Sequence, residues 1–395
     1  MQTGGTAKLT KEWKDVDLEL KTAYYFGDQV KKKDIFKDKL MPLLAGKTDT
    51  LERAKIAYNY VQKNIKWNEF ISRGSWDGIR KAFDKHTGNV ADINLGLVAA
   101  LTAAGVNADA VLVSTRDNGI VSKLSPVLDE FNYVIVKTDI GGRIYLLDAT
   151  DPLLSFGLLP IRCLNDEGRV ISLNKPSYWV DVNRQSEAST SALNFTLTDN
   201  GKLKGTIINY LFGYDAYLKR KDIKKFNSKE EYIEDFDEKR PRLKVISANI
   251  ANLDSLDSPL TETYEVEIDT YDNLDATRLT FNPFLFNRIT VNPFKLAERS
   301  YPVDWGMPST ERVTLTIHLP PKYTVENPPK NINIALPFNG GKFVTSFDAQ
   351  ANSFVFSHAI IFSKAIYSTQ EYPYLKELYN QIILSEKVDL VFKKN

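Results

Sequence analysis

The stretch "HTGNVADINLGLVAAL", residues 86–101, begins as a polar turn and continues as an apolar helix. Apolar residues recur every three or four positions from Val90 to Ala104, which is the spacing of one buried face of an α-helix. Asn89 is a favourable N-cap, and Gly105 is a favourable C-terminal stop. The stretch therefore predicts a buried helix that begins at Val90, directly after a Gly-Asn pair.

The segments around this helix predict an α+β domain. Further helices are predicted over 28–46 and 48–65. After the Val90 helix the pattern changes to short runs of β-branched and aromatic residues, which predict strands at 108–115, 131–138 and 143–149. We therefore expect residues 1–185 to form helices followed by a small antiparallel sheet, with a core at about 50–170 and an N-terminal strap before it.

Beyond a polar linker at 179–192 the sequence is mostly of β character. Residues 194–211 predict a hairpin with Asn200-Gly201 at its turn. Further strand-like runs follow at 263–270, 312–319, 332–338 and 352–363. We expect 186–395 to be a mostly antiparallel β-sandwich domain with a helical insertion at about 212–239 and a C-terminal helix near 370–386. The tripeptide "NPF" occurs at 282–284 and 292–294, but two copies do not make a repeat architecture.

Composition excludes several classes of function. The 395 residues are enough for two domains, and 51 Lys+Arg against 50 Asp+Glu leave a net charge of +1, so charge gives no argument for a nucleic-acid partner. The single cysteine, Cys163, excludes an intrachain disulfide and a cysteine-based metal cluster. Three scattered histidines predict neither a metal site nor a cofactor. No apolar run reaches the ~20 residues of a transmembrane segment.

Three segments together resemble a known superfamily. "TGNVADINLGLVAALTAAGVNADAVLVSTR" (87–116), "FNYVIV" (131–136) and "YLLDATDP" (145–152) are similar, in that order, to the transglutaminase-like proteins of papain-like fold. More narrowly, the chain resembles bacterial cell-envelope proteins in which such a domain sits between β-sandwich domains. The resemblance implies a periplasmic or cell-envelope location, and the N-terminal sandwich of that arrangement is expected to be missing here.

Catalytic members of this superfamily use a Cys-His-Asp set. A cysteine opens the helix, where the dipole and free N–H groups stabilise its thiolate, and a histidine oriented by an aspartate takes the thiol proton. The resemblance places Val90, Tyr133 and Asp148 at these three positions. A valine cannot attack a carbonyl group, and a phenol with a pKa near ~10 is a poor base at neutral pH. The resemblance therefore implies a degenerate catalytic set in which only Asp148 is kept, and it favours an inactive protein over an enzyme.

A vacated cleft would still be lined by polar and aromatic side chains. The candidates are Trp67, Trp76, Asn89, Asp92 and Asn132. We expect the Tyr133 hydroxyl to donate a hydrogen bond to Asp148, in place of the original imidazole. Cys163 lies outside the matching motif, with no base nearby in sequence, and is expected to be a small buried hydrophobe.

Three functions remain open at this point. The first is a catalytically inactive protein that acts as a binding or scaffolding module of a bacterial cell envelope, for an unknown protein, peptide or glycan ligand. The second is an active cysteine-type amide-bond enzyme, a protease or acyltransferase, with a displaced nucleophile such as Cys163. The third is a glycan- or peptide-binding protein whose ligand occupies the old cleft or the face of the sandwich.

Overall fold

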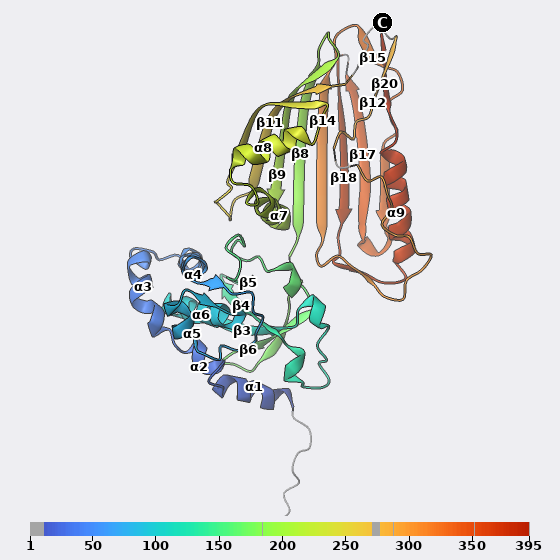
Figure 1. Cartoon of the computed structure of the whole chain (residues 1–395). Coiled ribbons are helices and arrows are strands. Elements are labelled where there is room, and N and C mark those ends of the chain that lie inside the picture. Colours follow the sequence, from blue (N-terminus) through green and yellow to red (C-terminus); the bar gives the residue numbers. More distant parts are fainter. Residues whose placement is uncertain (1–11, 184, 271–276, 287, 351, 395) are drawn as a thin grey trace, which may run out of the picture. The chain divides into compact units, whose positions relative to one another are not determined.

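The chain divides into two compact units, Met1–Gln185 and Ser186–Asn395. A computed structural model describes residues 12–183, 185–270, 277–286, 288–350 and 352–394 (Figure 1). The first unit joins helices to a five-stranded sheet, and the second is built on an eight-stranded sheet. The predicted α+β fold class is confirmed.

The first unit is organised around one central helix. Its helices are α1 (Trp13–Thr22), α2 (Gly27–Val30), α3 (Asp34–Leu44), α4 (Thr50–Asn64), α5 (Ile79–Asp84) and α6 (Val90–Ala103). The predicted start of α6 at Val90 is confirmed. Instead of one buried face, every residue of α6 from Val90 to Leu101 is buried, because α2 to α5 pack around it and the sheet covers the remaining side. Gly96 permits this packing, since a β-carbon there would lie 2.5 Å from the Phe83 ring.

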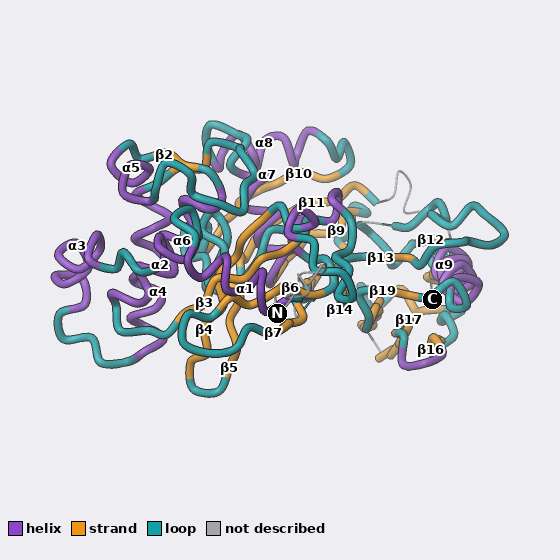
Figure 2. The backbone as a smooth tube through the Cα atoms, turned by 90° about the horizontal axis from the view of Figure 1, so that it is seen from below, coloured by secondary structure: helices purple, strands orange, loops and turns teal. Residues whose placement is uncertain are grey.

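The sheet of the first unit has the order β5-β4-β3-β6-β7, and all its neighbouring strands are antiparallel. Its strands are β3 (Ala108–Val113), β4 (Tyr133–Ile140), β5 (Arg143–Leu147), β6 (Glu167–Ile171) and β7 (Tyr178–Asp181). A parallel pair, β1 (Lys66–Trp67) with β2 (Thr87–Gly88), precedes α6. α6 packs on β3 and β4, which lie side by side in Figure 2. Short 3₁₀ turns occupy Arg116–Asn118, Leu128–Glu130 and Ile161–Cys163.

The second unit is built on a sheet of order β10-β11-β9-β8-β14-β18-β17-β16. These strands are β8 (Glu187–Leu197), β9 (Lys202–Phe212), β10 (Leu243–Ala251), β11 (Leu260–Asp269), β14 (Ser309–His318), β16 (Ile332–Leu336), β17 (Gly341–Gln350) and β18 (Ser353–Phe362). The pair β8–β14 is parallel and the other pairs are antiparallel. The predicted hairpin at 194–211 is the β8–β9 pair.

Smaller elements cover one face of this sheet. They are the helices α7 (Gly213–Ile223), α8 (Lys229–Glu238) and α9 (Tyr372–Ser385), a three-stranded sheet of β12 (Arg278–Phe281), β20 (Leu390–Lys394) and β15 (Tyr323–Val325), the pair β13 (Val303–Asp304) with β19 (Ile366–Tyr367), and a 3₁₀ turn at Pro337–Asn339. Figure 1 shows α7 and α8 near β9 and β11, and α9 near β17. These smaller elements form the second layer on the apolar face of the sheet: in β8, buried Leu193, Phe195 and Leu197 alternate with exposed polar residues.

The two "NPF" segments dock on α9 in the same way. The Asn282 side chain accepts a hydrogen bond from Phe284 N and donates one to Glu386 O, at 3.0 and 2.9 Å. The Asn292 side chain accepts from Phe294 N and donates to Lys376 O, at 2.9 and 2.8 Å. Each following phenylalanine is buried in the core. The tripeptide is thus a local docking device rather than a unit of a repeat.

Candidate functional site in the first unit

The start of α6 is a closed, well-capped helix terminus. Asn89 Oδ1 accepts from Asp92 N at 2.8 Å, and Asp92 Oδ2 accepts from Asn89 N at 2.9 Å, so the two residues form a capping box. Ser75 donates to the other carboxylate oxygen of Asp92. Val90 is fully buried, and its N–H donates to Phe70 O at 3.3 Å. An isopropyl group therefore occupies the position at which the resemblance would place a thiolate.

A buried carboxylate lies beneath this helix. The Tyr133 hydroxyl at the start of β4 donates to Asp148 Oδ2 at 2.8 Å, and both side chains are fully buried. The hydrogen bond predicted from the sequence is therefore present. Asn94 donates to the same Asp148 oxygen at 3.0 Å and stands four residues after Val90. Because residues four apart share a helix face, Val90 faces the sheet that carries Tyr133 and Asp148.

Donors satisfy both oxygens of this carboxylate. Thr150 donates to Asp148 Oδ1 through its N–H at 2.8 Å and through its hydroxyl at 2.5 Å. Asn94 also donates to Val134 O at 2.9 Å and accepts from Ala149 N at 3.0 Å, which ties α6 to β4 and to the turn after β5. Burial raises the pKa of Asp148, and the bonds from Thr150 and Tyr133 offset part of that rise. The network is the structural link between α6 and the sheet.

An arginine from a later segment completes the cluster. Arg162 Nη2 donates to the Tyr133 hydroxyl at 3.1 Å. Its guanidinium carbon lies 4.5 Å from the centroid of the Trp67 ring and 5.4 Å from that of Tyr133, which are cation–π distances. Arg162 Nε is buried without a hydrogen-bond partner. A positive charge therefore lies between two aromatic rings beside the buried carboxylate.

Cys163 belongs to the same cluster, although the sequence places it outside the motif. The thiol is fully buried, as expected of a small hydrophobe. Burial and the charge of Asp148 raise the pKa of this thiol well above its usual range. Burial and Asp148 likewise raise the pKa of the Tyr133 hydroxyl well above its usual range. Neither group is ionised at neutral pH, so the cluster holds no thiolate and no phenolate.

The other predicted cleft residues lie in different surroundings. Trp76 is half exposed and stacks on Tyr25 with ring centroids 4.2 Å apart. The Asn132 side chain accepts from Thr115 N at 3.0 Å, at the end of β3. Trp67 alone of the two tryptophans contacts the cluster, through Arg162. A cleft-lining role for Trp67, Trp76, Asn89, Asp92 and Asn132 stays a prediction.

Sequence reasoning missed three members of the cluster, Asn94, Thr150 and Arg162. Asn94 was detectable as a polar residue within an apolar helix, which must find partners when it is buried. Thr150 follows Asp148 at the spacing of a local side-chain turn. Arg162 carried no signal, since sequence spacing does not place a loop after β5 over the start of β4.

Neither a metal-binding group nor a membrane-spanning helix occurs among the described residues. No group of three or more His, Cys, Asp or Glu side chains among them is arranged to hold a metal ion. No helix in that part of the chain is both long and apolar enough to span a membrane.

Comparisons with known proteins bear mainly on the fold. A family model described as a domain of unknown function with a solved structure, DUF3858, matches residues 277–392. A crystal structure of a "putative protease" from Parabacteroides distasonis is similar to this chain with a TM-score of 0.53 and 15% sequence identity. The similarity covers 96% of this chain but 58% of that protein, so this chain spans little more than half of its length. No curated protein matches the chain. At this identity, the structural likeness concerns the fold alone.

Proposed function

We propose that this chain is a catalytically inactive member of the transglutaminase-like superfamily that acts as a binding or scaffolding module. A place in a bacterial cell envelope is part of the proposal and rests on the sequence resemblance alone. The likeness to a structure described as a protease supports the fold, and the chemistry of the cluster argues against the corresponding activity.

The hydrogen bond from Tyr133 to Asp148 is the observation on which the proposal depends. In a Cys-His-Asp set, this carboxylate orients an imidazole that accepts the proton of the thiol. Here it accepts from the Tyr133 hydroxyl. Because the pKa of this hydroxyl is raised, it keeps its proton at neutral pH and cannot act as a base. Val90 supplies no nucleophile at the helix terminus. The site therefore has neither a suitable base nor a suitable nucleophile.

The position of Cys163 favours a second candidate, an amide-bond enzyme with a displaced nucleophile. Its thiol lies beside Tyr133 and Asp148, as a displaced nucleophile would. Attack on a substrate, however, requires a thiolate that the substrate can reach. The Cys163 thiol is fully buried and its pKa is raised, so the inactive protein is the function that the geometry supports better.

One experiment separates the two candidates. The purified protein and its Cys163→Ala variant are assayed for peptidase and transamidase turnover, and the native thiol is challenged with iodoacetamide. We expect no turnover by either protein, and alkylation of Cys163 only after unfolding in urea. Turnover that Cys163→Ala abolishes would establish the displaced nucleophile. Turnover that survives in Cys163→Ala would also contradict the proposed inactivity, and it would show that a residue other than Cys163 is the nucleophile.

The binding role is tested at the same cluster with peptide and glycan arrays. Trp67→Ala removes the ring that contacts Arg162, and Trp76→Ala is the matched control because that ring stacks on Tyr25 instead. We expect the unmodified protein to bind a ligand on one of the arrays. Trp67→Ala should weaken this binding, and Trp76→Ala should not. Equal effects of the two variants, or no retained ligand, would contradict binding at this cluster.

A further inference from the structure

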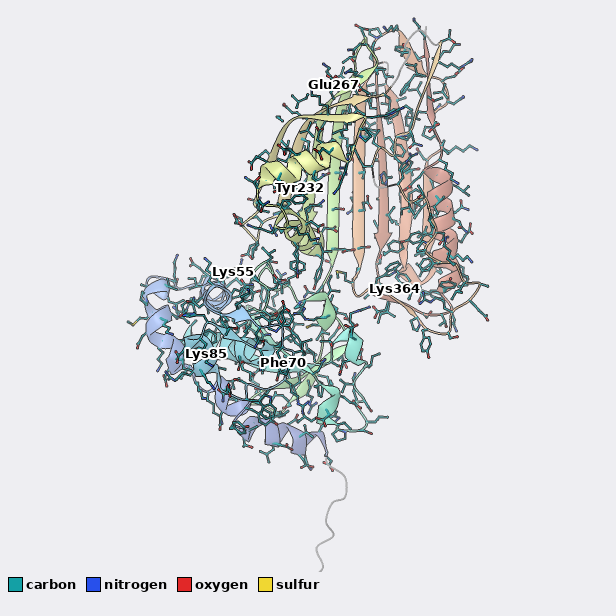
Figure 3. The ribbon with its side chains drawn as sticks, in the orientation of Figure 1. Lys55, Phe70, Lys85, Tyr232, Glu267 and Lys364 are labelled. Atoms are coloured by element: carbon teal, nitrogen blue, oxygen red, sulfur yellow. The ribbon has the colours of Figure 1, made fainter. Side chains whose placement is uncertain are left out.

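The second unit contains a cavity on the covered face of its large sheet. The cavity has a volume of about 110 Å³ and is partly open to solvent, so it is smaller than the ~300–1,000 Å³ typical of drug-sized pockets and has room for a small ligand. Strands β8, β9, β11, β14 and β18 contribute lining residues to it, and so do α7, α8 and the loop after β12. Figure 3 labels Tyr232 on α8, whose hydroxyl bonds to one of these lining residues. All of the lining belongs to Ser186–Asn395.

One carboxylate of the lining is fully satisfied. Glu262 accepts from the hydroxyls of Tyr232 and Tyr264 at 2.8 and 3.2 Å, and from the Asn209 amide at 3.2 Å. Asn209 in turn accepts from the Ser191 hydroxyl at 2.8 Å. This chain of bonds is internal and rigid, so Glu262 needs no further partner.

Two other polar side chains of the lining lack a partner among the described residues: the partly exposed carboxylate of Glu311 and the buried Nδ1 of His358. The Glu311 carboxylate on β14 has neither an ion pair nor a hydrogen bond with any residue that the structure describes. Burial and the negative charge of Asp215 raise its pKa, so its surroundings favour the arrival of a cation. His358 on the neighbouring strand β18 is 8% exposed, and its Nδ1 is buried without a partner. Buried polar groups without partners are rare in native proteins and call for an explanation such as a bound molecule.

The walls of the cavity are apolar and aromatic. Phe236, Phe284, Phe286 and Leu285 line it, and the Phe284 ring lies 4.9 Å from the His358 ring. Two basic side chains also line it. Arg240 is engaged by α8 itself, since its guanidinium carbon lies 3.8 Å from the Phe236 ring centroid and Nη1 donates to Phe236 O. Lys219 Nζ lies 3.5 Å from the Tyr232 hydroxyl. Neither cation forms an ion pair with a described residue, but each is held at the wall by these contacts, whereas the Glu311 carboxylate makes no such contact.

We propose that this cavity binds an organic cation, an ammonium or guanidinium group carried on an apolar or aromatic body. The cationic head pairs with the Glu311 carboxylate and lies near the neutral imidazole of His358, while the body packs between Phe284 and Phe286. A basic side chain of a peptide and a free arylalkylamine share this chemistry. The proposal concerns the second unit only and does not depend on the function proposed for the first.

The test compares three probes that differ only in their head group: phenethylamine, phenethyl alcohol and hydrocinnamate. The full chain is titrated with each probe at about pH 8 and followed by proton NMR of the imidazole C–H signals. The sequence has only three histidines, so His358→Gln assigns the signal of the cavity, while His86 and His318 serve as internal controls. Glu311→Gln removes the charge at the cavity, and Glu234→Gln on the exposed side of α8 is the matched control.

We expect phenethylamine to shift the His358 signal alone and to bind at least about tenfold more tightly than the alcohol, since hydrogen bonds to a charged group carry that much selectivity. Glu311→Gln should remove the preference, and Glu234→Gln should keep it. The head-group comparison on the unmodified protein stands even where Glu311→Gln perturbs the fold. Absence of a His358 shift with phenethylamine, equal binding of the alcohol, or preference for hydrocinnamate through Lys219 and Arg240 would each overturn the proposal. Loss of the preference for phenethylamine in the control variant Glu234→Gln would also overturn it.

For a peptide ligand, the same cavity should discriminate by side chain. Acetylated amides of arginine and lysine are expected to displace phenethylamine from the protein, whereas the acetylated amide of norleucine is not. Displacement by norleucine amide to the same extent would show that the apolar body alone determines binding, and it would contradict the role of Glu311.

Discussion

The Tyr133 hydroxyl joins two charged groups, the buried Asp148 carboxylate and the Arg162 guanidinium. It donates to a fully buried carboxylate and accepts from Arg162, so it compensates the burial of Asp148 and of a guanidinium at once. The partnership with Asp148 could be predicted from the sequence, because the resemblance aligns Tyr133 with the partner of this aspartate and a buried carboxylate needs a donor. The contacts with Arg162 and Cys163 could not, because they come from a loop distant in sequence.

Removal of this hydroxyl should be costly. Tyr133→Phe leaves Asp148 with one donor fewer and Arg162 with only its longer hydrogen bond, 3.4 Å to the Thr150 hydroxyl, so we expect a loss of about 1–3 kcal/mol in the free energy of unfolding. Tyr24→Phe is the control in the same unit, since Tyr24 is 60% exposed, and should change stability by less than about 0.5 kcal/mol. Urea denaturation of both variants measures the difference. Equal stabilities would mean that the network carries no net stabilisation.

His358 should make the second unit sensitive to acid. Burial lowers the pKa of His358 to about 4, below the ~6.5 of an unfolded histidine, so the unfolded state takes up a proton first as the pH falls. The associated stability is present near neutral pH and is lost as the pH falls from about 7 towards 4, by about 2 kcal/mol between about pH 7.5 and pH 5. His358→Gln should lack this component, and His318→Gln on the exposed side of β14 should retain it. Urea denaturation at the two pH values decides, and identical pH dependence in the two variants would refute the assignment.

Elements with a strong internal pattern were predictable, and those formed by long-range pairing were not. The α6 helix was predicted to begin at Val90 and does so, because capping residues and apolar spacing agree there. Strands β6 and β7 were missed because they are short and pair with a sheet whose earlier strands are distant in sequence. The unequal layers of the second unit were also missed, since residue alternation shows that one face is buried but not what covers it.

The two "NPF" segments should each contribute to the docking of α9. Asn292→Ala removes the hydrogen bond from the segment to Lys376 of α9 and one within the segment, and Asn282→Ala removes the one to Glu386, directly after α9, and one within its segment, so each is expected to cost about 1–2 kcal/mol. Asn333→Ala on the exposed side of β16 is the control. Thermal unfolding followed by circular dichroism measures all three. A control as destabilised as the two variants would contradict this role.

At the scale of the whole molecule, we propose that the two units fold independently. Each has its own buried core, and the units meet in the chain at Gln185 and Ser186. Separate expression of 12–185 and 186–394 should yield two proteins that unfold cooperatively, each with a midpoint close to its transition in the full chain. A fragment without a cooperative transition, or a midpoint shifted by many degrees, would show that the units depend on one another for stability.

The pKa of a thiol introduced at position 90 tests the central claim most directly. Val90→Cys and Val90→Cys/Tyr133→His are compared in a Cys163→Ala background, so that ultraviolet absorbance against pH reports one thiolate. In the single variant, burial at the site of Val90 opposes ionisation and Tyr133 cannot accept the proton, so we expect a pKa at or above the ordinary ~8.5. In the double variant, Asp148 should orient the new imidazole and the thiol pKa should fall clearly below that value. The same pKa in both variants, with both folded, would contradict the assignment of Val90, Tyr133 and Asp148 to a degenerate Cys-His-Asp site.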